Sequence, residues 1–75
     1  MTAFQTRLRE LRSECGFTQK GLAEQLNTTS DSIYSWEKGR SEPSIAMICK
    51  LCHILDVSAD YLLGVEDETN TKSFR

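Results

Sequence analysis

The segment CKLCH, residues 49–53, contains side chains that commonly bind metals or haem. Its spacing matches the C-x-x-C-H string to which c-type haem is attached. We reject haem because Cys52 is needed for the apolar face of a helix and the N-terminus shows no export signal. Zinc is not expected either, since Cys49, Cys52 and His53 lack a second pair of ligands. The sequence therefore predicts no metal and no cofactor, with Cys52 in the core, Cys49 partly covered, and a redox role for the thiols left open.

No combination of side chains in the sequence is typical of an enzyme active site. His53 is the only histidine, and no nucleophile is placed to work with it. A helical chain of 75 residues also has little room for a buried active site. We therefore predict that the protein is not an enzyme.

A second polar stretch, NTTSDSIYSWEKGR at residues 27–40, has side chains suited to nucleic acid. Hydroxyl groups surround a single aspartate, Asp31, and two cationic side chains, Lys38 and Arg40, flank the glycine near its end. Hydroxyl, carboxylate and cationic groups can bind base edges and phosphates. The same stretch places Trp36 directly beside Glu37, a pairing that a surface helix does not require.

The net charge of −2 at first argues against a nucleic-acid-binding protein. The charge is unevenly distributed, however. Residues 1–40 hold six Lys or Arg against five Asp or Glu, whereas residues 41–75 hold three against six. A modest basic face on the first half of the chain therefore remains compatible with nucleic acid.

Length and composition indicate one small soluble domain. The chain has 75 residues, of which 39% are hydrophobic and 27% charged. No apolar run approaches the roughly 20 residues that a membrane span needs, and the N-terminus lacks the apolar stretch of a signal peptide. We expect a cytoplasmic protein with no membrane partner, whose cysteines are reduced.

Apolar residues recur at intervals of three and four in five short segments, which predicts five helices and no strand. Thr18, Thr29 and Ser58 are placed to cap three of the helices, and Pro43-Ser44 opens a fourth. The expected buried stripes are Phe4, Leu8, Leu11 and Cys15; Leu22, Ala23 and Leu26; Ile33 and Trp36; Ile45, Ile48, Leu51, Cys52 and Leu55; with Val57 packing on Leu62 in the last helix. Residues 1–64 should form this all-α domain, and the polar residues 65–75 a disordered tail.

The second and third helices are joined only by NTT, so they must cross closely, and Ala23 is small enough to permit this. We interpret residues 18–38, approximately, as a helix-turn-helix motif. The string TQKGLAEQLNTTSDSIYSWEKG resembles the helix-turn-helix of the Cro/lambda-repressor-like (XRE) family, and PSIAMICKLCHILDVSADYLLG resembles its last two helices. The resemblance covers about residues 5–64, and Gly21, Asn27 and Thr28 depart from the family pattern.

The resemblance implies a compact five-helix lambda-repressor-like DNA-binding domain. Arg12 and Glu37 are expected to form a structural ion pair, which would explain why a glutamate follows the tryptophan. The residues expected to read base edges are Gln19, Ser30, Asp31, Tyr34 and Ser35. Gln19 falls where the family contacts a phosphate and sometimes a base. The residues expected to bind phosphates are Thr18, Lys20, Thr29, Lys38, Arg40 and Ser41.

These features predict sequence-specific binding of double-stranded DNA by a transcriptional regulator, more precisely a repressor that binds a palindromic operator as a weak homodimer. By the resemblance, the dimer contact is expected from Tyr61, Leu62 and Val65. The alternative is an antitoxin-like or regulator-binding protein-interaction module with the same fold. The sequence pI of about 5.3 and the acidic Asp31 favour that alternative.

Overall fold

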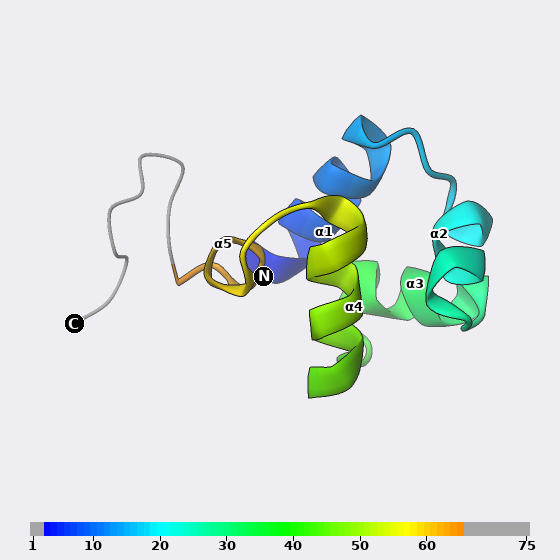
Figure 1. Cartoon of the computed structure of the whole chain (residues 1–75). Helices are drawn as coiled ribbons and strands as arrows, with labels where there is room; N and C mark the ends of the chain where they lie inside the picture. Colours follow the sequence, from blue (N-terminus) through cyan, green and yellow to red (C-terminus); the bar gives the residue numbers. More distant parts are fainter. Residues whose placement is uncertain (1–2, 66–75) are drawn as a thin grey trace.

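The computed structural model describes residues 3–65 and contains five α-helices and no strand in this part of the chain. α1 spans Ala3–Glu14, α2 Gln19–Leu26, α3 Ser30–Lys38, α4 Ile45–Leu55 and α5 Ala59–Leu63 (Figure 1). The all-α prediction is therefore confirmed. The predicted tail falls almost entirely on residues 66–75, which lie outside the described residues.

Four helices begin at hydroxyl residues. The side-chain oxygen of each accepts a hydrogen bond from the backbone N–H three residues later, which satisfies one of the donors left open at a helix start. The cap residues are Thr18, Thr29, Ser44 and Ser58, and they bind the N–H groups of Gly21, Ser32, Met47 and Tyr61. The predicted helix starts are therefore confirmed.

The same four helices end at a residue in the left-handed conformation, namely Asn27, Gly39, Asp56 and Gly64. Gly64 also meets α1 closely, because a Cβ there would lie 2.7 Å from the Cβ of Ala3. The N–H of Val65 donates to the carbonyl of Asp60 at 2.9 Å. Val65 therefore closes the end of α5.

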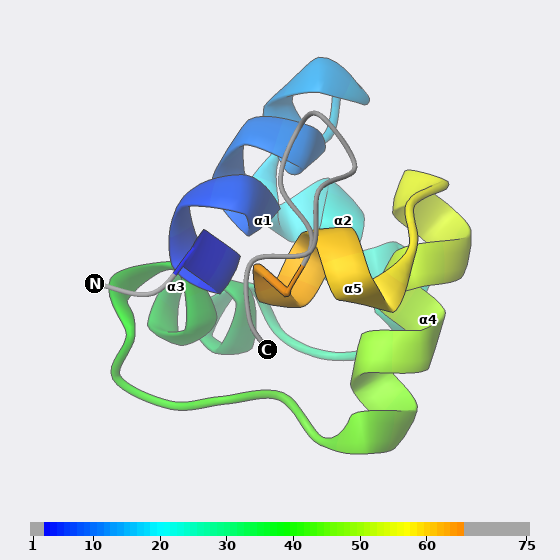
Figure 2. The ribbon, with the colours of Figure 1, turned by 90° about the vertical axis from the view of Figure 1, so that its left-hand side faces the viewer.

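The helices surround one core. α2 packs against α3 and α4, α1 packs against α3 and α5, and α4 also packs against α5. Figure 2 shows α5 lying between α1 and α4. α3 is consequently held in place by both α1 and α2.

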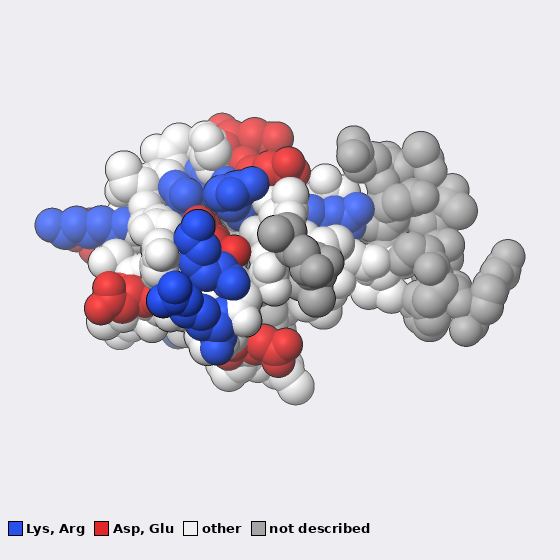
Figure 3. Space-filling view, turned by 180° about the vertical axis from the view of Figure 1, so that it is seen from behind, with Lys and Arg blue, Asp and Glu red and all other residues white. Residues whose placement is uncertain are grey.

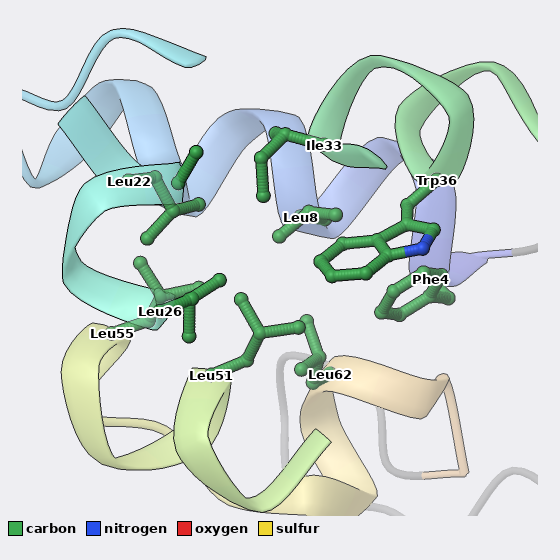
Figure 4. Packing of buried hydrophobic residues seen from close by; sticks show 10 residues of the cluster. Phe4, Leu8, Leu22, Leu26, Ile33, Trp36, Leu51, Leu55 and Leu62 are labelled. Atoms are coloured by element: carbon green, nitrogen blue, oxygen red, sulfur yellow. The ribbon is translucent and has the colours of Figure 1, made fainter. Parts of the chain in front are cut away.

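Ten apolar residues form the buried core, and side chains from all five helices meet there (Figure 4). The indole of Trp36 lies beside the ring of Phe4. Burying one large apolar side chain contributes about 1.5–3 kcal/mol. The core residues are Phe4, Leu8, Leu22, Ala23, Leu26, Ile33, Trp36, Leu51, Leu55 and Leu62.

Two residues predicted in buried stripes are exposed instead. Cys15 is exposed because α1 ends at Glu14, so that Cys15 no longer lies on the buried face of the helix. Ile45 is 85% exposed because it opens α4, whose first turn extends beyond the neighbouring helices (Figure 1). Cys52 is half-buried rather than part of the core, and Cys49 is exposed.

The three thiols should differ in reactivity. Burial, with a smaller effect of the neighbouring Cys49 thiol, raises the pKa of Cys52. Because the thiolate is the reactive form, we expect iodoacetamide at mildly alkaline pH to alkylate Cys15 and Cys49 before Cys52. A time course followed by peptide mass spectrometry measures the three rates, and in urea they should become similar. Equal rates for Cys49 and Cys52 in the folded protein would contradict this assignment.

Candidate nucleic-acid interface

A tight turn fixes α2 against α3. Asn27 takes the left-handed conformation with a φ of 58°, and the N–H of Thr28 donates to the carbonyl of Ala23 at 2.9 Å. Ala23 is buried in the core, and its small side chain lets the two helices approach closely. The crossing of α2 and α3, and with it the direction of the outward face of α3, is therefore set by the turn.

The outward face of α3 presents most of the residues predicted to read bases. Ser30 and Asp31 in its first turn are exposed, and so is Tyr34 one turn later. Ser35 is half-buried at the edge of this face. The two apolar residues of the helix point into the core (Figure 4). The structure therefore brings these four polar residues together on one helix.

Two cationic side chains lie close to the ring of Tyr34 near the end of α3. Lys38 Nζ lies 5.6 Å and Arg40 Cζ 5.5 Å from the centroid of its ring. Both cations are exposed, so a cation–π contact with the ring leaves them accessible to a phosphate. The sequence predicted the cations but missed these contacts, which the spacing of four between Tyr34 and Lys38 could have indicated.

Positively charged side chains are also concentrated on one face of the whole domain. Figure 3 shows Lys and Arg side chains gathered in the middle of one face of the molecule, with most of the Asp and Glu toward its margins and a few carboxylate atoms directly beside the cations. Such a distribution lets a chain with a small negative net charge attract phosphates locally.

Thr18 and Thr29, two predicted phosphate contacts, already have a structural role. Their hydroxyl oxygens cap α2 and α3, because they accept hydrogen bonds from the backbone N–H groups of Gly21 at 2.9 Å and of Ser32 at 3.2 Å. A hydroxyl that accepts such a bond can still donate its proton to an anion at the helix start. Lys20 and Ser41, two further predicted phosphate contacts, are exposed.

An ion pair joins α1 to α3. The guanidinium of Arg12 binds the carboxylate of Glu37 through two hydrogen bonds, Nε to Oε2 at 2.6 Å and Nη2 to Oε1 at 3.3 Å. The Glu37 side chain is 4% exposed and the Arg12 side chain 16%. Arg12 Nη1 also donates to the backbone carbonyl of Phe17 at 2.9 Å. Arg12 thus ties α1 to α3 and to the loop that leads into α2.

Gln19 completes this partly buried group. It is the first residue of α2, and its Nε2 donates to Glu37 Oε1 at 3.2 Å. Glu37 therefore connects α1, α2 and α3 at one point. The sequence placed Gln19 at the DNA and Glu37 in an ion pair, but gave no sign that the two would meet.

The three residues predicted for a dimer contact lie in different environments. Leu62 is fully buried, so its side chain has no surface to offer a second copy, and this prediction is corrected. Tyr61 and Val65 are half-buried, and the Arg7 guanidinium lies 4.2 Å from the Tyr61 ring centroid. Leu63, the neighbour of Leu62, is 47% exposed.

An apolar groove of about 330 Å³ lies beside Leu63. It runs between the start of α1, the end of α3, the start of α4 and the end of α5. The exposed Ile45 and Leu63 are its most accessible apolar side chains. Its apolar lining residues are Phe4, Trp36, Pro43, Ile45, Ile48 and Leu63.

None of the described helices is long and apolar enough to cross a membrane. Among residues 3–65, no group of three or more His, Cys, Asp or Glu side chains could hold a metal ion. Cys49, Cys52 and His53 line an open depression on the surface of α4 instead.

The family model described as a helix-turn-helix domain matches residues 6–68. The chain belongs to this helix-turn-helix family. Among its relatives is the HTH-type transcriptional regulator ImmR of Bacillus subtilis, 39% identical over 67 residues, which are 89% of this chain and 52% of ImmR. The chain spans 52% of the length of ImmR, and 60% and 56% of two further Bacillus subtilis HTH-type regulators, YqaE and YonR.

Solved structures of helix-turn-helix proteins share this fold. The P22 c2 repressor, in complex with a synthetic operator, superposes with a TM-score of 0.78 at 27% identity, over 84% of this chain and 96% of the repressor. SinR, a master regulator for biofilm formation in complex with DNA, gives 0.74 at 31% identity, over 80% and 97%. The predicted lambda-repressor-like fold and the resemblance to the XRE family are thereby confirmed.

Proposed function

We propose that this helix-turn-helix protein binds specific double-stranded DNA and regulates transcription. The polar, exposed outward face of α3 carries this proposal. The P22 c2 repressor and SinR, which share the fold, are both seen in complex with DNA. Binding to chromosomal DNA would place the protein in the cytoplasm, and it requires neither a cofactor nor an enzymatic activity.

In this proposal the N-terminal half of α3 enters the major groove. The residues that read base edges there are Gln19, Ser30, Asp31, Tyr34 and Ser35. The residues that bind the flanking phosphates are Thr18, Lys20, Thr29, Lys38, Arg40 and Ser41. The charges of Lys38 and Arg40 offset the repulsion between Asp31 and the phosphates.

Asp31 gives a direct test of base reading. A carboxylate near DNA is stable only when it accepts a hydrogen bond from a base, and the donors in the major groove are cytosine N4 and adenine N6. We expect Asp31→Asn to raise affinity for every duplex by removing one negative charge. It should also shift the preference at one position of each half-site toward adenine, which an amide reads with two hydrogen bonds. Titrations against single-base changes in a site selected from random duplex DNA measure both effects.

Asp60→Asn is the matched control, because Asp60 is an exposed aspartate in the first turn of α5. It should leave every base preference unchanged. If Asp31→Asn also leaves them unchanged, Asp31 is only a favourable helix-start residue. If the protein binds no duplex with an affinity that falls steeply with salt, the protein-interaction alternative replaces DNA binding.

A second copy across the apolar groove would complete the regulator. One helix-turn-helix reads only a few base pairs, and a dimer on two half-sites doubles the sequence that is read. The groove lies between the ends of α3 and α5, so two copies that bury Ile45 and Leu63 would hold their α3 helices at a fixed separation. We therefore expect a weak homodimer that represses by occupying a palindromic operator.

The dimer contact can be tested with one charge. We expect Leu63→Asp to bind a duplex with two half-sites no more tightly than a duplex with one, because two buried carboxylates would repel across the interface. Ala46→Asp is the control, since Ala46 is exposed on α4 next to Ile45 but does not line the groove. Sedimentation with each duplex measures the stoichiometry. A cooperative two-site complex formed by Leu63→Asp at wild-type affinity would contradict this interface.

A further inference from the structure

The contact between Gln19 and Glu37 fixes which way the Gln19 amide points. The Glu37 carboxylate is bound by the Arg12 guanidinium and can only accept hydrogen bonds. The amide atom that faces Glu37 Oε1 at 3.2 Å must therefore be the nitrogen, Nε2, and not the oxygen. The chemistry of the ion pair alone decides this orientation.

The other arm of the amide, Oε1, is consequently turned away from Glu37. Oε1 has no hydrogen-bond partner among residues 3–65, although Gln19 is half-buried. No side-chain oxygen or nitrogen in this part of the chain is buried without a partner. Gln19 Oε1 is therefore accessible to solvent, at the start of α2 beside the cap residue Thr18.

We propose that Glu37, by accepting one N–H of Gln19 Nε2, turns Oε1 outward as the acceptor that Gln19 presents to DNA, so that Gln19 reads a base amino group through Oε1. The proposal rests on the DNA-binding function inferred above. Phosphate oxygens are acceptors and repel an amide oxygen, whereas cytosine N4 and adenine N6 donate in the major groove. Glu37, whose side chain is only 4% exposed, acts as the positioning residue, and Gln19 is the contact.

Gln19→Met tests the proposal, because it removes both polar atoms at similar length. We expect a roughly five- to tenfold loss of affinity for the preferred base pair at one position of each half-site, the effect of one lost hydrogen bond. Affinity for the other three base pairs at that position should stay unchanged. Gln25→Met is the matched control on the exposed side of α2 and should change nothing.

Base analogues identify the atom that is read. If adenine is preferred, 2-aminopurine lacks its 6-amino group, and if cytosine is preferred, pyrimidin-2-one lacks its 4-amino group. We expect wild-type protein to bind the duplex with the analogue roughly five- to tenfold more weakly than the natural duplex, and Gln19→Met to bind both duplexes with the same affinity. A second variant, Glu37→Gln, gives the amide a partner that can also donate, and it should weaken this one preference while thermal unfolding shows that the domain remains folded.

The possible outcomes distinguish this inference from the proposed DNA-binding function. If wild-type protein binds DNA specifically but Gln19→Met weakens all sequences alike, Gln19 is a phosphate contact and the inference is overturned. The inference is also overturned if the analogue binds as tightly as the natural base. If wild-type protein binds no duplex at all, both the proposed function and the inference fail.

Discussion

Replacing Glu37 with alanine is expected to lower the free energy of unfolding by about 3–5 kcal/mol. The substitution removes three hydrogen bonds at once, two from Arg12 and one from Gln19. It leaves the guanidinium of Arg12, whose side chain is only 16% exposed, with the Phe17 carbonyl as its remaining hydrogen-bond partner. A domain of this size has about 5–15 kcal/mol of stability in total. Urea denaturation followed by circular dichroism measures the loss.

A double-mutant cycle separates the ion pair from a general effect of the site. Arg12→Met combined with Glu37→Ala removes both charges. This double variant should lower the free energy of unfolding clearly less than Glu37→Ala alone. Glu24→Ala, at an exposed carboxylate of α2, is the control and should change stability by less than about 0.5 kcal/mol. A coupling energy near zero would show that Arg12 and Glu37 do not stabilise each other.

The helix boundaries could be predicted because they are decided locally. Hydroxyl caps such as Thr18 and left-handed residues such as Asn27 act within one helical turn, so their signal is present in a few consecutive residues. The buried faces of α2 and α3 followed from spacing for the same reason. The ion pair was different, because its partners are 25 residues apart and only the family resemblance joined them.

What the sequence could not show was which helix covers each residue. Ile45 fits the apolar stripe of α4 as well as Leu51 does, yet Leu51 is buried and Ile45 is exposed, because no neighbour covers the first turn. The sequence indicates two roles for Leu62, packing beside Val57 and contacting a second copy, and the position of α5 between α1 and α4 buries Leu62 and leaves Leu63 exposed. The bond from Gln19 to Glu37 likewise depends on the crossing of α2 and α3.

These differences relocate two parts of the candidate site. The surface that we propose for a second copy is the groove with Ile45 and Leu63, and it excludes the buried Leu62. Gln19 can no longer be treated as a freely rotating amide, because its nitrogen is bound to Glu37. Both changes come from packing between helices, which is the level that spacing within one helix does not encode.

Removing Lys38 and Arg40 together should weaken binding to every duplex, whatever its sequence. Each cation can neutralise one phosphate, and a hydrogen bond to a charged group contributes about 1.5–3 kcal/mol, so we expect a loss on the order of tenfold or more for each at low salt. The slope of log affinity against log salt should fall by about one unit for each residue, and by about two for Lys38→Ala with Arg40→Ala. Titrations at several salt concentrations, on a selected site and on a scrambled duplex, measure both quantities.

Two matched variants show whether the position of these cations matters, and not only their charge. Lys50→Ala removes an exposed lysine from α4 and should leave the salt slope nearly unchanged, because α4 does not present a predicted phosphate contact. Tyr34→Phe keeps the ring on which Lys38 and Arg40 lie, whereas Tyr34→Ala removes it. If the ring orders both cations for phosphate binding, Tyr34→Ala should lower the affinity for every duplex more than Tyr34→Phe does. The loss should still be smaller than that caused by Lys38→Ala with Arg40→Ala. Unchanged salt slopes in all of these variants would mean that Lys38 and Arg40 serve only to cover Tyr34, and that the phosphates are bound elsewhere on the domain.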